Sequence, residues 1–301
     1  MRAQRRLLVV AAVVLALALT QTAHATMEER GEELFREGVR LANEGDYDSA
    51  LEYFERTMAY TPRLNVLWNI ACCHVVLGKR DLAVACLDRY MEHDLAFQRS
   101  AEMQAVVAAI AAEPPDMPDL DRRGELWNRV EAASRAVGEG RATPATVEQR
   151  RYGVGNRGVQ VKTMDTSSTP EGQRALYLTG RVYELASRGH LEEALPLAER
   201  TLAYRVRPNP YYNIAGIHLM MGHRDLALAF LDRYQQLLPP LRESAEFQDL
   251  MADIADAPPA IDYRTAARLY DRLDPVIERA IPPTPTPSAR PPVRTEIGDE
   301  N

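Results

Sequence analysis

Hydrophobic residues recur at helical spacing along most of this chain, in short segments that glycines and prolines separate. Leu34, Val39 and Leu41 follow this spacing, and a period of about 3.6 residues predicts an amphipathic helix. Gly45 ends the first such segment. Further helices are predicted over residues 47–60, 66–77, 81–91 and 100–112. The pattern therefore predicts an all-α fold.

The whole pattern occurs twice. Residues 45–115 align without a gap with residues 189–259, each residue matching the one 144 positions later, and nearly half of the positions are identical. A duplication this regular indicates one supersecondary unit that is used twice. Downstream of each copy, the segment LWNRV at 126–130 matches LYDRL at 269–273. We therefore expect two homologous units, over residues 26–139 and 174–281, each made of three helical hairpins.

Small residues mark the turns and close approaches of the predicted hairpins. Gly38 and Ala50 stand where two antiparallel helices would cross. In the second copy, Val182 takes the place of Gly38, and Pro196 falls inside a predicted helix, where it removes a backbone hydrogen bond and is expected to cause a kink. A glycine after a helix favours a left-handed turn that ends it, and such glycines stand at positions 45, 78, 189 and 222.

These features together resemble the tetratricopeptide repeat, a helix-turn-helix unit of about 34 residues. The resemblance covers residues 31–97 and 175–241, and it rests on Gly38, Gly45, Ala50 and Pro62 in one hairpin and on Ala71, Gly78, Ala83 and Leu87 in the next. It implies a solenoid in which the first helix of each hairpin lines a concave groove that holds a segment of a partner protein. A divergent third hairpin would cap the end of each unit.

The resemblance also implies which residues line the two grooves. They are Phe35, Trp68 and Asn69 in the first unit and Tyr183, Tyr212 and Asn213 in the second. The two asparagines match the place where peptide-binding members hold a ligand backbone. The alternative is that the aromatic side chains only pack against neighbouring helices.

The chain begins with a segment typical of a secretory signal peptide. Three arginines precede an apolar run from Leu7 to Thr20, and Ala23-His24-Ala25 forms a small-x-small cleavage site. A retained membrane anchor is the alternative, but the run is short for a span, which needs roughly 20 residues. We therefore expect residues 1–25 to be removed and the remaining chain to be exported without a membrane contact.

Two further segments lack an apolar period. Residues 140–173 are rich in Gly, Thr, Ser and Arg and predict a flexible linker that lets the two units move independently. Residues 282–301 are rich in proline and predict an extended, disordered tail.

Composition and local strings argue against several classes of function. The net charge of −7 and the lack of a predicted basic face make nucleic acid a poor partner. The string HRDL at 223–226 and the glycine pattern at 153–158 lack the surrounding elements of a kinase or a dinucleotide fold. Because no catalytic set is found, we expect a protein that is not an enzyme and needs no cofactor.

The cysteines and two of the histidines are predicted to be packing residues. Cys72, Cys73 and Cys86 occur in the first copy alone, and a Cys73–Cys86 disulfide is the alternative for an exported protein. His74 and His218 are equivalent, with a metal site or a proton switch as the alternative. No Cys, Asp or Glu stands at ligand spacing to both histidines, so we predict no metal site.

The sequence therefore predicts a non-enzymatic protein-interaction scaffold or adaptor of the cell envelope, which binds protein or peptide segments in its grooves. Similar exported chains suggest the periplasm of a Gram-negative cell, with secretion as the alternative location. One alternative function is a structural protein that self-assembles into a homo-oligomer through its third hairpins. Another is an accessory subunit that regulates a cell-wall enzyme.

Overall fold

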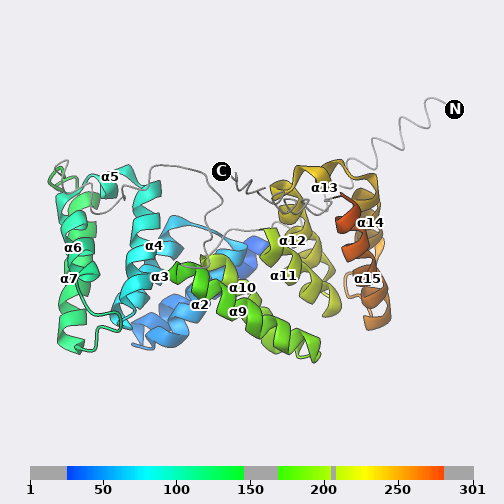
Figure 1. The fold of residues 1–301 in the computed structure, drawn as a ribbon, viewed down its shortest axis with the longest axis horizontal. Helices are drawn as coiled ribbons and strands as arrows, with labels where there is room; N and C mark the ends of the chain where they lie inside the picture. Colours follow the sequence, from blue (N-terminus) through cyan, green and yellow to red (C-terminus); the bar gives the residue numbers. More distant parts are fainter. Residues whose placement is uncertain (1–25, 146–168, 205–207, 281–301) are drawn as a thin grey trace, which may run out of the picture.

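The computed structural model describes residues 26–145, 169–204 and 208–280. Within these residues the fold is all-α, as predicted, and no strand occurs; Ser100 with Pro144 and His223 with Ala260 form isolated bridges. Figure 1 shows an elongated molecule with α3–α7 at one end, α11–α15 at the other, and α2, α9 and α10 between them.

The helices of the two halves correspond closely. In the first half, residues 26–43 are helical, and they are followed by α2 (Tyr47–Tyr60), α3 (Leu64–Val76), α4 (Arg80–His93), α5 (Leu95–Gln98), α6 (Ala101–Ala111) and α7 (Leu120–Gly138). The second half contains α9 (Pro170–Ser187), α10 (Leu191–Tyr204), α11 (Pro208–Met220), α12 (Arg224–Leu237), α13 (Pro239–Glu243), α14 (Ala245–Asp256) and α15 (Tyr263–Ala280).

Local chemistry accounts for the ends of these helices. The four predicted turn glycines all have a left-handed backbone, with φ of 84° at Gly45, 75° at Gly78, 80° at Gly189 and 80° at Gly222. The equivalent residues Ser100 and Ser244 cap α6 and α14, because each hydroxyl accepts a hydrogen bond from a backbone N–H of the first turn. The prediction of left-handed turns is confirmed.

The first hairpin of each half is packed by a different pair of side chains. A Cβ atom on Gly38 would lie 2.8 Å from the ring of Phe54, so only glycine fits beside that ring. In the second half, Val182 replaces Gly38 and Ala198 replaces Phe54, and both are buried. The larger side chain of the pair therefore lies on the second helix of the hairpin in the first half and on the first helix of the hairpin in the second half. Despite Pro196, α10 runs from Leu191 to Tyr204 without interruption.

The third hairpin of each half covers the first helix of the second hairpin. Helix α7 contacts α3, and α15 contacts α11. A Cβ atom on Gly216 of α11 would lie 2.6 Å from the ring of Tyr270 on α15, so this face of α11 is filled by the protein itself.

Each of the two hydrophobic cores contains residues from both halves. The core of the second half includes Leu34, Ala59 and Tyr60 from the first half. Reciprocally, the core of the first half includes the equivalent residues Leu178, Ala203 and Tyr204. The prediction that the two units move independently is wrong, because each unit completes the core of the other.

Several predicted segments lie outside the described residues: the signal peptide at 1–25, positions 146–168 of the linker and the tail at 282–301. The described start of the linker is attached to α6, since the backbone N–H of Thr143 donates to Glu102 and that of Ala145 to the carbonyl of Arg99. Among the described helices, none combines the length and the apolar character needed to cross a bilayer.

Candidate functional site

The equivalent helices α2 and α10 lie side by side at the centre of the molecule (Figure 1). Both carry the pattern Glu-Arg-Thr-x-Ala-Tyr, at residues 55–60 in α2 and 199–204 in α10. The polar side chains of one helix therefore meet their own counterparts on the other. They form two buried clusters, which we name the Glu55 network and the Glu199 network.

The Glu55 network consists of Glu55 and His74 from the first half and Arg200 and Tyr204 from the second. The Glu55 side chain is fully buried and accepts hydrogen bonds from Arg200 Nε and from the Tyr204 hydroxyl. Arg200 Nη1 also lies 2.5 Å from Glu52 Oε1. Burial raises the pKa of the Glu55 carboxyl, and the Arg200 guanidinium opposes that rise.

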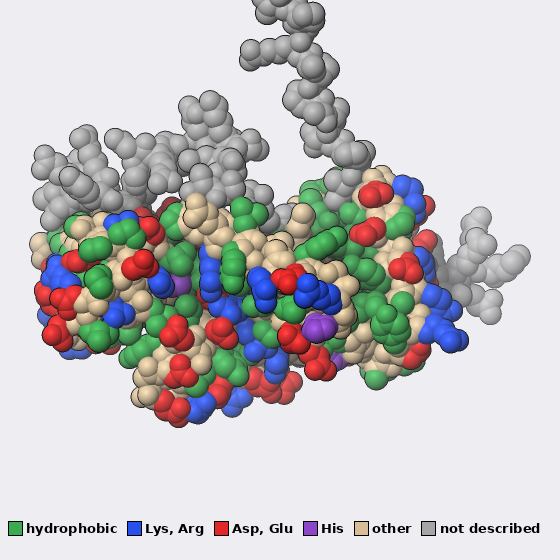
Figure 2. Space-filling view, turned by 60° about the horizontal axis from the view of Figure 1, so that its bottom comes forward, with side chains coloured by type: hydrophobic (Ala, Val, Ile, Leu, Met, Phe, Trp, Pro, Cys, Tyr) green, Lys and Arg blue, Asp and Glu red, His purple; other side chains and the backbone are tan. Residues whose placement is uncertain are grey.

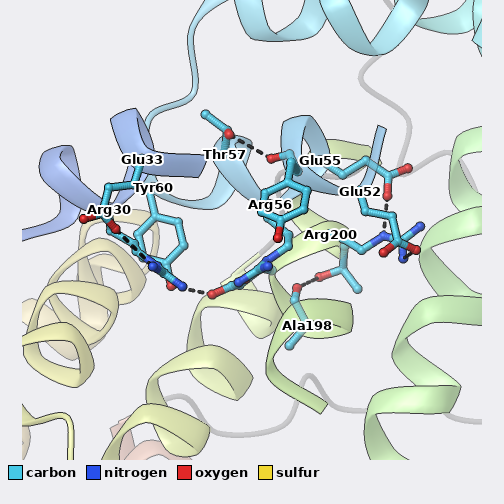
Figure 3. Close-up of polar contacts among 12 residues, drawn as sticks. Arg30, Glu33, Glu52, Glu55, Arg56, Thr57, Tyr60, Ala198 and Arg200 are labelled. Atoms are coloured by element: carbon cyan, nitrogen blue, oxygen red, sulfur yellow. Dashed lines mark hydrogen bonds and ion pairs between the residues drawn. The ribbon is translucent and has the colours of Figure 1, made fainter. Parts of the chain in front are cut away.

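The Glu199 network repeats this arrangement with the halves exchanged. It consists of Glu199 and His218 from the second half and Arg56 and Tyr60 from the first. Glu199 is fully buried; Arg56 Nε lies 2.6 Å from its Oε2 atom, and the Tyr60 hydroxyl donates to its Oε1 atom. Figure 3 shows Glu55, Arg56 and Tyr60 of the first half beside Arg200 of the second. Each network is complete only when both halves are present.

The histidines extend both networks by one hydrogen bond. His74 Nε2 lies 3.0 Å from the Tyr204 hydroxyl, and His218 Nε2 lies 3.3 Å from that of Tyr60. Because each tyrosine gives its single proton to a glutamate, each histidine must donate from Nε2, which assigns its tautomer. Burial lowers the pKa of both imidazoles to about 3, with Arg174 the next cause at His74 and His223 at His218. Both histidines are therefore neutral at pH 7.

The two networks differ in their outermost partners. His218 Nδ1 lies 3.2 Å from His223 Nδ1, whereas His74 Nδ1 has no hydrogen-bond partner among the described residues. Glu52 gives Arg200 a second carboxylate, but its equivalent in the second half is Pro196. Arg56 instead lies over the ring of Tyr53. The Glu199 network thus holds its arginine with fewer acidic groups.

Two equivalent arginines donate hydrogen bonds to the C-terminal carbonyls of α2 and α10. Arg233 of α12 donates to the carbonyls of Ala59 and Tyr60 at 2.6 and 2.7 Å, and Arg89 of α4 donates to the carbonyl of Ala203 at 2.6 Å. Positive charge at the C-terminal end of a helix is favourable because the last carbonyls carry partial negative charge. Each half therefore also caps a helix of the other.

The networks are closed to solutes. The side chains of Glu55, Glu199, His74 and His218 have almost no exposed surface. We call the contact between α2 and α10, with both networks, the junction. A pocket of about 260 Å³ borders the junction, and Tyr60 is the one member of either network among its lining residues, together with Met27, Arg63 and Arg233. No three His, Cys, Asp or Glu side chains in the described residues are grouped to hold a metal ion. The geometry suits a role in holding the halves together.

Three of the six predicted groove residues pack on neighbouring helices. Trp68 lies against Tyr90 and Phe97, with ring centroids 5.2 and 5.6 Å apart, and Phe35 lies 5.8 Å from Phe54. The ring of Tyr212 packs on Tyr234, and its hydroxyl donates to Asp274 of α15.

The other three predicted groove residues differ in their exposure to solvent. Asn69 and Asn213 are half-buried, and neither makes a side-chain hydrogen bond to a described residue. Tyr183 is 80 % exposed. Tyr183 is therefore the aromatic residue among the six that faces solvent, whereas the aromatic side chains of the other three pack on neighbouring helices.

Tyr183 belongs to an exposed apolar stripe on α9. Leu176 is 50 % exposed and Tyr177 is 61 % exposed, and Leu176, Gly180 and Tyr183 follow one another at i, i+4 and i+7. We name these four residues the α9 outer face. Figure 2 shows hydrophobic side chains at many points of the surface among charged ones, so the helical spacing, more than exposure itself, distinguishes this face.

The first half has charged residues at three of the same four positions. The equivalents of the α9 outer face are Glu32, Glu33, Arg36 and Val39. Glu32 pairs with Arg63 and Glu33 with Arg30. The apolar stripe is thus a property of the second half.

The three cysteines are buried free thiols, which confirms the prediction that they are packing residues. Burial raises the pKa of the Cys73 thiol to about 12. The alternative of a Cys73–Cys86 disulfide is not adopted, because both thiols are free.

No known protein family and no curated protein matches this sequence. Sequence reasoning missed both networks, although it identified His74 and His218 as equivalent. The available signal was the repetition of Glu-Arg-Thr-x-Ala-Tyr at 55–60 and 199–204, which places two identical charged pairs at matching positions.

Proposed function

We propose that the chain is a non-enzymatic protein-interaction scaffold of the tetratricopeptide type, and that the α9 outer face holds an amphipathic helix of a partner protein. The observation that carries this proposal is the exposure of Leu176, Tyr177 and Tyr183 on a helix whose first-half equivalent is charged. Exposed apolar side chains gathered in one place mark interaction sites in soluble proteins.

The spacing on α9 supports a helical partner. A helix that lies in a surface groove presents anchors at i, i+3, i+4 and i+7, and the receiving helix needs a depression between its own ridges. A Cβ atom on Gly180 would meet no atom within 4 Å, so an open space lies there between Leu176 and Tyr183. An apolar side chain of the partner would enter this space.

The junction between the halves also supports the proposal, because it holds α9 in a fixed position. Helix α9 packs on α10 and α4, and α10 is tied to α2 by both networks. A surface that is held in place before binding loses less conformational entropy on binding than a mobile one.

The sequence and the observed hairpins together support the proposed repeat type, and the sequence alone supports the proposed location. Helix-turn-helix pairs with left-handed glycine turns support the tetratricopeptide type. The predicted signal peptide supports an envelope location, with the periplasm proposed first and secretion second.

The test is site-specific photo-crosslinking in native envelope, with a photoreactive residue at position 183 and, as a matched control, at the equivalent position 39. We expect crosslinks from position 183 to a small set of proteins, through peptides of amphipathic helical pattern. The Leu176→Ala/Tyr183→Ala variant should recover at least tenfold less of these proteins than the Glu32→Ala/Val39→Ala variant, which changes the same positions of the first half. Equal recovery by the two variants would contradict the proposal.

A further inference from the structure

The buried polar contacts at the centre of the junction are reciprocal, since each has a counterpart in which the halves are exchanged. Other contacts, such as that of the partly exposed Glu52 with Arg200, have no counterpart, because Pro196 is the equivalent of Glu52. The paired contacts are Glu55–Arg200 with Glu199–Arg56, Tyr204–His74 with Tyr60–His218, and Arg89–Ala203 with Arg233–Ala59. A contact set of this kind is the mark of an interface with twofold symmetry, as in a homodimer.

The apolar contacts follow the same rule. Leu34 and Tyr60 enter the core of the second half, and their equivalents Leu178 and Tyr204 enter the core of the first. The paired surfaces are therefore self-complementary, since each presents the acidic group, the basic group and the ring that the opposite surface requires.

No contact in this set requires the two halves to belong to the same chain. Residues 146–168 connect the last described residue of the first half with the first of the second. A fully extended segment of this length spans roughly 80 Å. The contacts and the length of the connection are therefore compatible with pairing within one chain or between two chains.

We propose that the surface that joins α2 and α10 is a self-docking surface, through which two copies of this chain form a reciprocal dimer by exchanging halves. In this dimer the first half of each chain pairs with the second half of the other. Both networks then form twice, and no buried charge loses its partner. Exchange of equivalent elements costs little for this reason.

The balance between the two forms depends on protein concentration. Two halves that are joined by a connection of this length have an effective concentration for each other on the order of 1 mM. Chains that refold at about 1 μM should close almost entirely on themselves, whereas refolding at about 300 μM should give tens of per cent of dimer. Because interconversion must break buried ion pairs, the dimer should persist after dilution.

The experiment uses the full mature chain with a specific protease site inserted between Asn156 and Arg157. The protein is unfolded in denaturant with reductant, refolded at about 1 and 300 μM, and weighed by light scattering after size exclusion. The separated monomer and dimer are then cut with the protease and weighed again under native conditions.

We expect the dimer fraction to rise at least tenfold between the two concentrations. Cutting should convert the dimer into particles of monomer mass, because each would then consist of a first half and a second half from different chains. The cut monomer should keep its mass. The Glu55→Gln/Glu199→Gln variant should release separate halves at lower denaturant than a Glu184→Gln/Glu192→Gln control, which changes one partly exposed and one exposed carboxylate outside the two networks.

Three results would overturn the proposal. The first is the absence of a dimer at any refolding concentration. The second is a dimer that keeps its mass after cutting, which would place the contact on another surface, such as the third hairpins. The third is separation of the cut wild-type monomer into halves in the absence of denaturant.

Discussion

The two copies of the repeated unit share the buried polar residues through which they contact each other, and they differ on the outer faces of their first helices. Glu55, Arg56 and Tyr60 have identical equivalents in the second half, and all of them lie in the junction. By contrast, Glu32 corresponds to Leu176 and Val39 to Tyr183. A change to either copy at the junction leaves a group of the other copy without its partner, whereas the outer face has no such constraint. The comparison separates the part of the molecule that joins the halves from the part available to a partner.

Within the junction, the two networks differ in how many carboxylates contact each arginine. Arg200 contacts both Glu55 and Glu52, while Arg56 contacts Glu199 and the ring of Tyr53. A buried charge without a counter-charge is costly, so the two networks should respond unequally to the same substitution.

The largest predicted effect comes from removing a buried glutamate. Glu199→Ala should lower the free energy of unfolding by roughly 3–5 kcal/mol, because it leaves Arg56 without a carboxylate in the described part of the chain. Glu55→Ala should lower the free energy of unfolding by a smaller amount, because Glu52 remains beside Arg200. Urea unfolding of both variants measures the difference, and an equal or reversed order would contradict this account of the networks.

The first hairpins offer a second comparison, with a smaller effect. Gly38→Val should destabilise the protein by about 1–3 kcal/mol, because the added side chain overlaps the ring of Phe54. Phe54→Ala alone should leave a cavity. The double variant reproduces the pair Val182 and Ala198, so it should be more stable than the sum of the two single changes predicts. A double-mutant cycle by urea unfolding checks this, and strict additivity would show that the two positions do not compensate.

The buried histidines predict a dependence of stability on pH. His74 faces Tyr204, Arg174, Arg200 and Lys79, and the pKa of its imidazole is about 3 in the fold, against about 6.5 in an unfolded chain. As the pH falls below about 6.5, the unfolded state binds a proton that the folded state does not. Stability should therefore decline with falling pH until the pH approaches 3.

The decline should amount to about 1.4 kcal/mol per pH unit for each buried histidine in that range. Urea unfolding at pH 7.5 and 5.5 measures it for the wild type and for His74→Gln, which should lose one histidine's share of the decline. His190→Gln, which changes an exposed histidine, is the control and should keep the wild-type pH dependence. An undiminished decline in His74→Gln would contradict the role assigned to its burial.

The smallest effect is expected on the α9 outer face. Tyr183→Ala should change the free energy of unfolding by less than about 0.5 kcal/mol, because its side chain is mostly in solvent. Leu178 is buried on the opposite side of the same helix, so Leu178→Ala should lower the free energy of unfolding by about 2–5 kcal/mol. Thermal and urea unfolding of the two variants compare them directly. A large loss in Tyr183→Ala would mean that this face stabilises the fold.

Much of the fold could be predicted because periodicity and glycine placement are local signals. The helices at 47–60, 66–77 and 100–112 match α2, α3 and α6 to within two residues. Helices α5 and α13 were not predicted because segments of four and five residues are too short to show a period.

The junction could not be predicted because its contacts join residues far apart in the chain. Glu55 and Arg56 resemble a charged pair on a solvated helix face when they are read in α2 alone. Their partners Arg200 and Glu199 lie 145 and 143 positions away. The composition of residues 140–173 indicated a linker, but it carried no information about whether the halves bind each other. For the same reason, the sequence did not distinguish Tyr183 from Trp68, since one faces solvent and the other a neighbouring helix.

The central claim, that the two halves stabilise each other through the junction, is tested most directly by urea unfolding followed with two probes. Both tryptophans, Trp68 and Trp127, lie in the first half, so their fluorescence reports that half, whereas far-UV circular dichroism reports helices of both. The account predicts coincident transitions, and it predicts that Leu273→Ala, a buried change in α15 of the second half, shifts the fluorescence midpoint as far as the dichroism midpoint. A fluorescence midpoint that stays at its wild-type value while the dichroism separates into two transitions would contradict it.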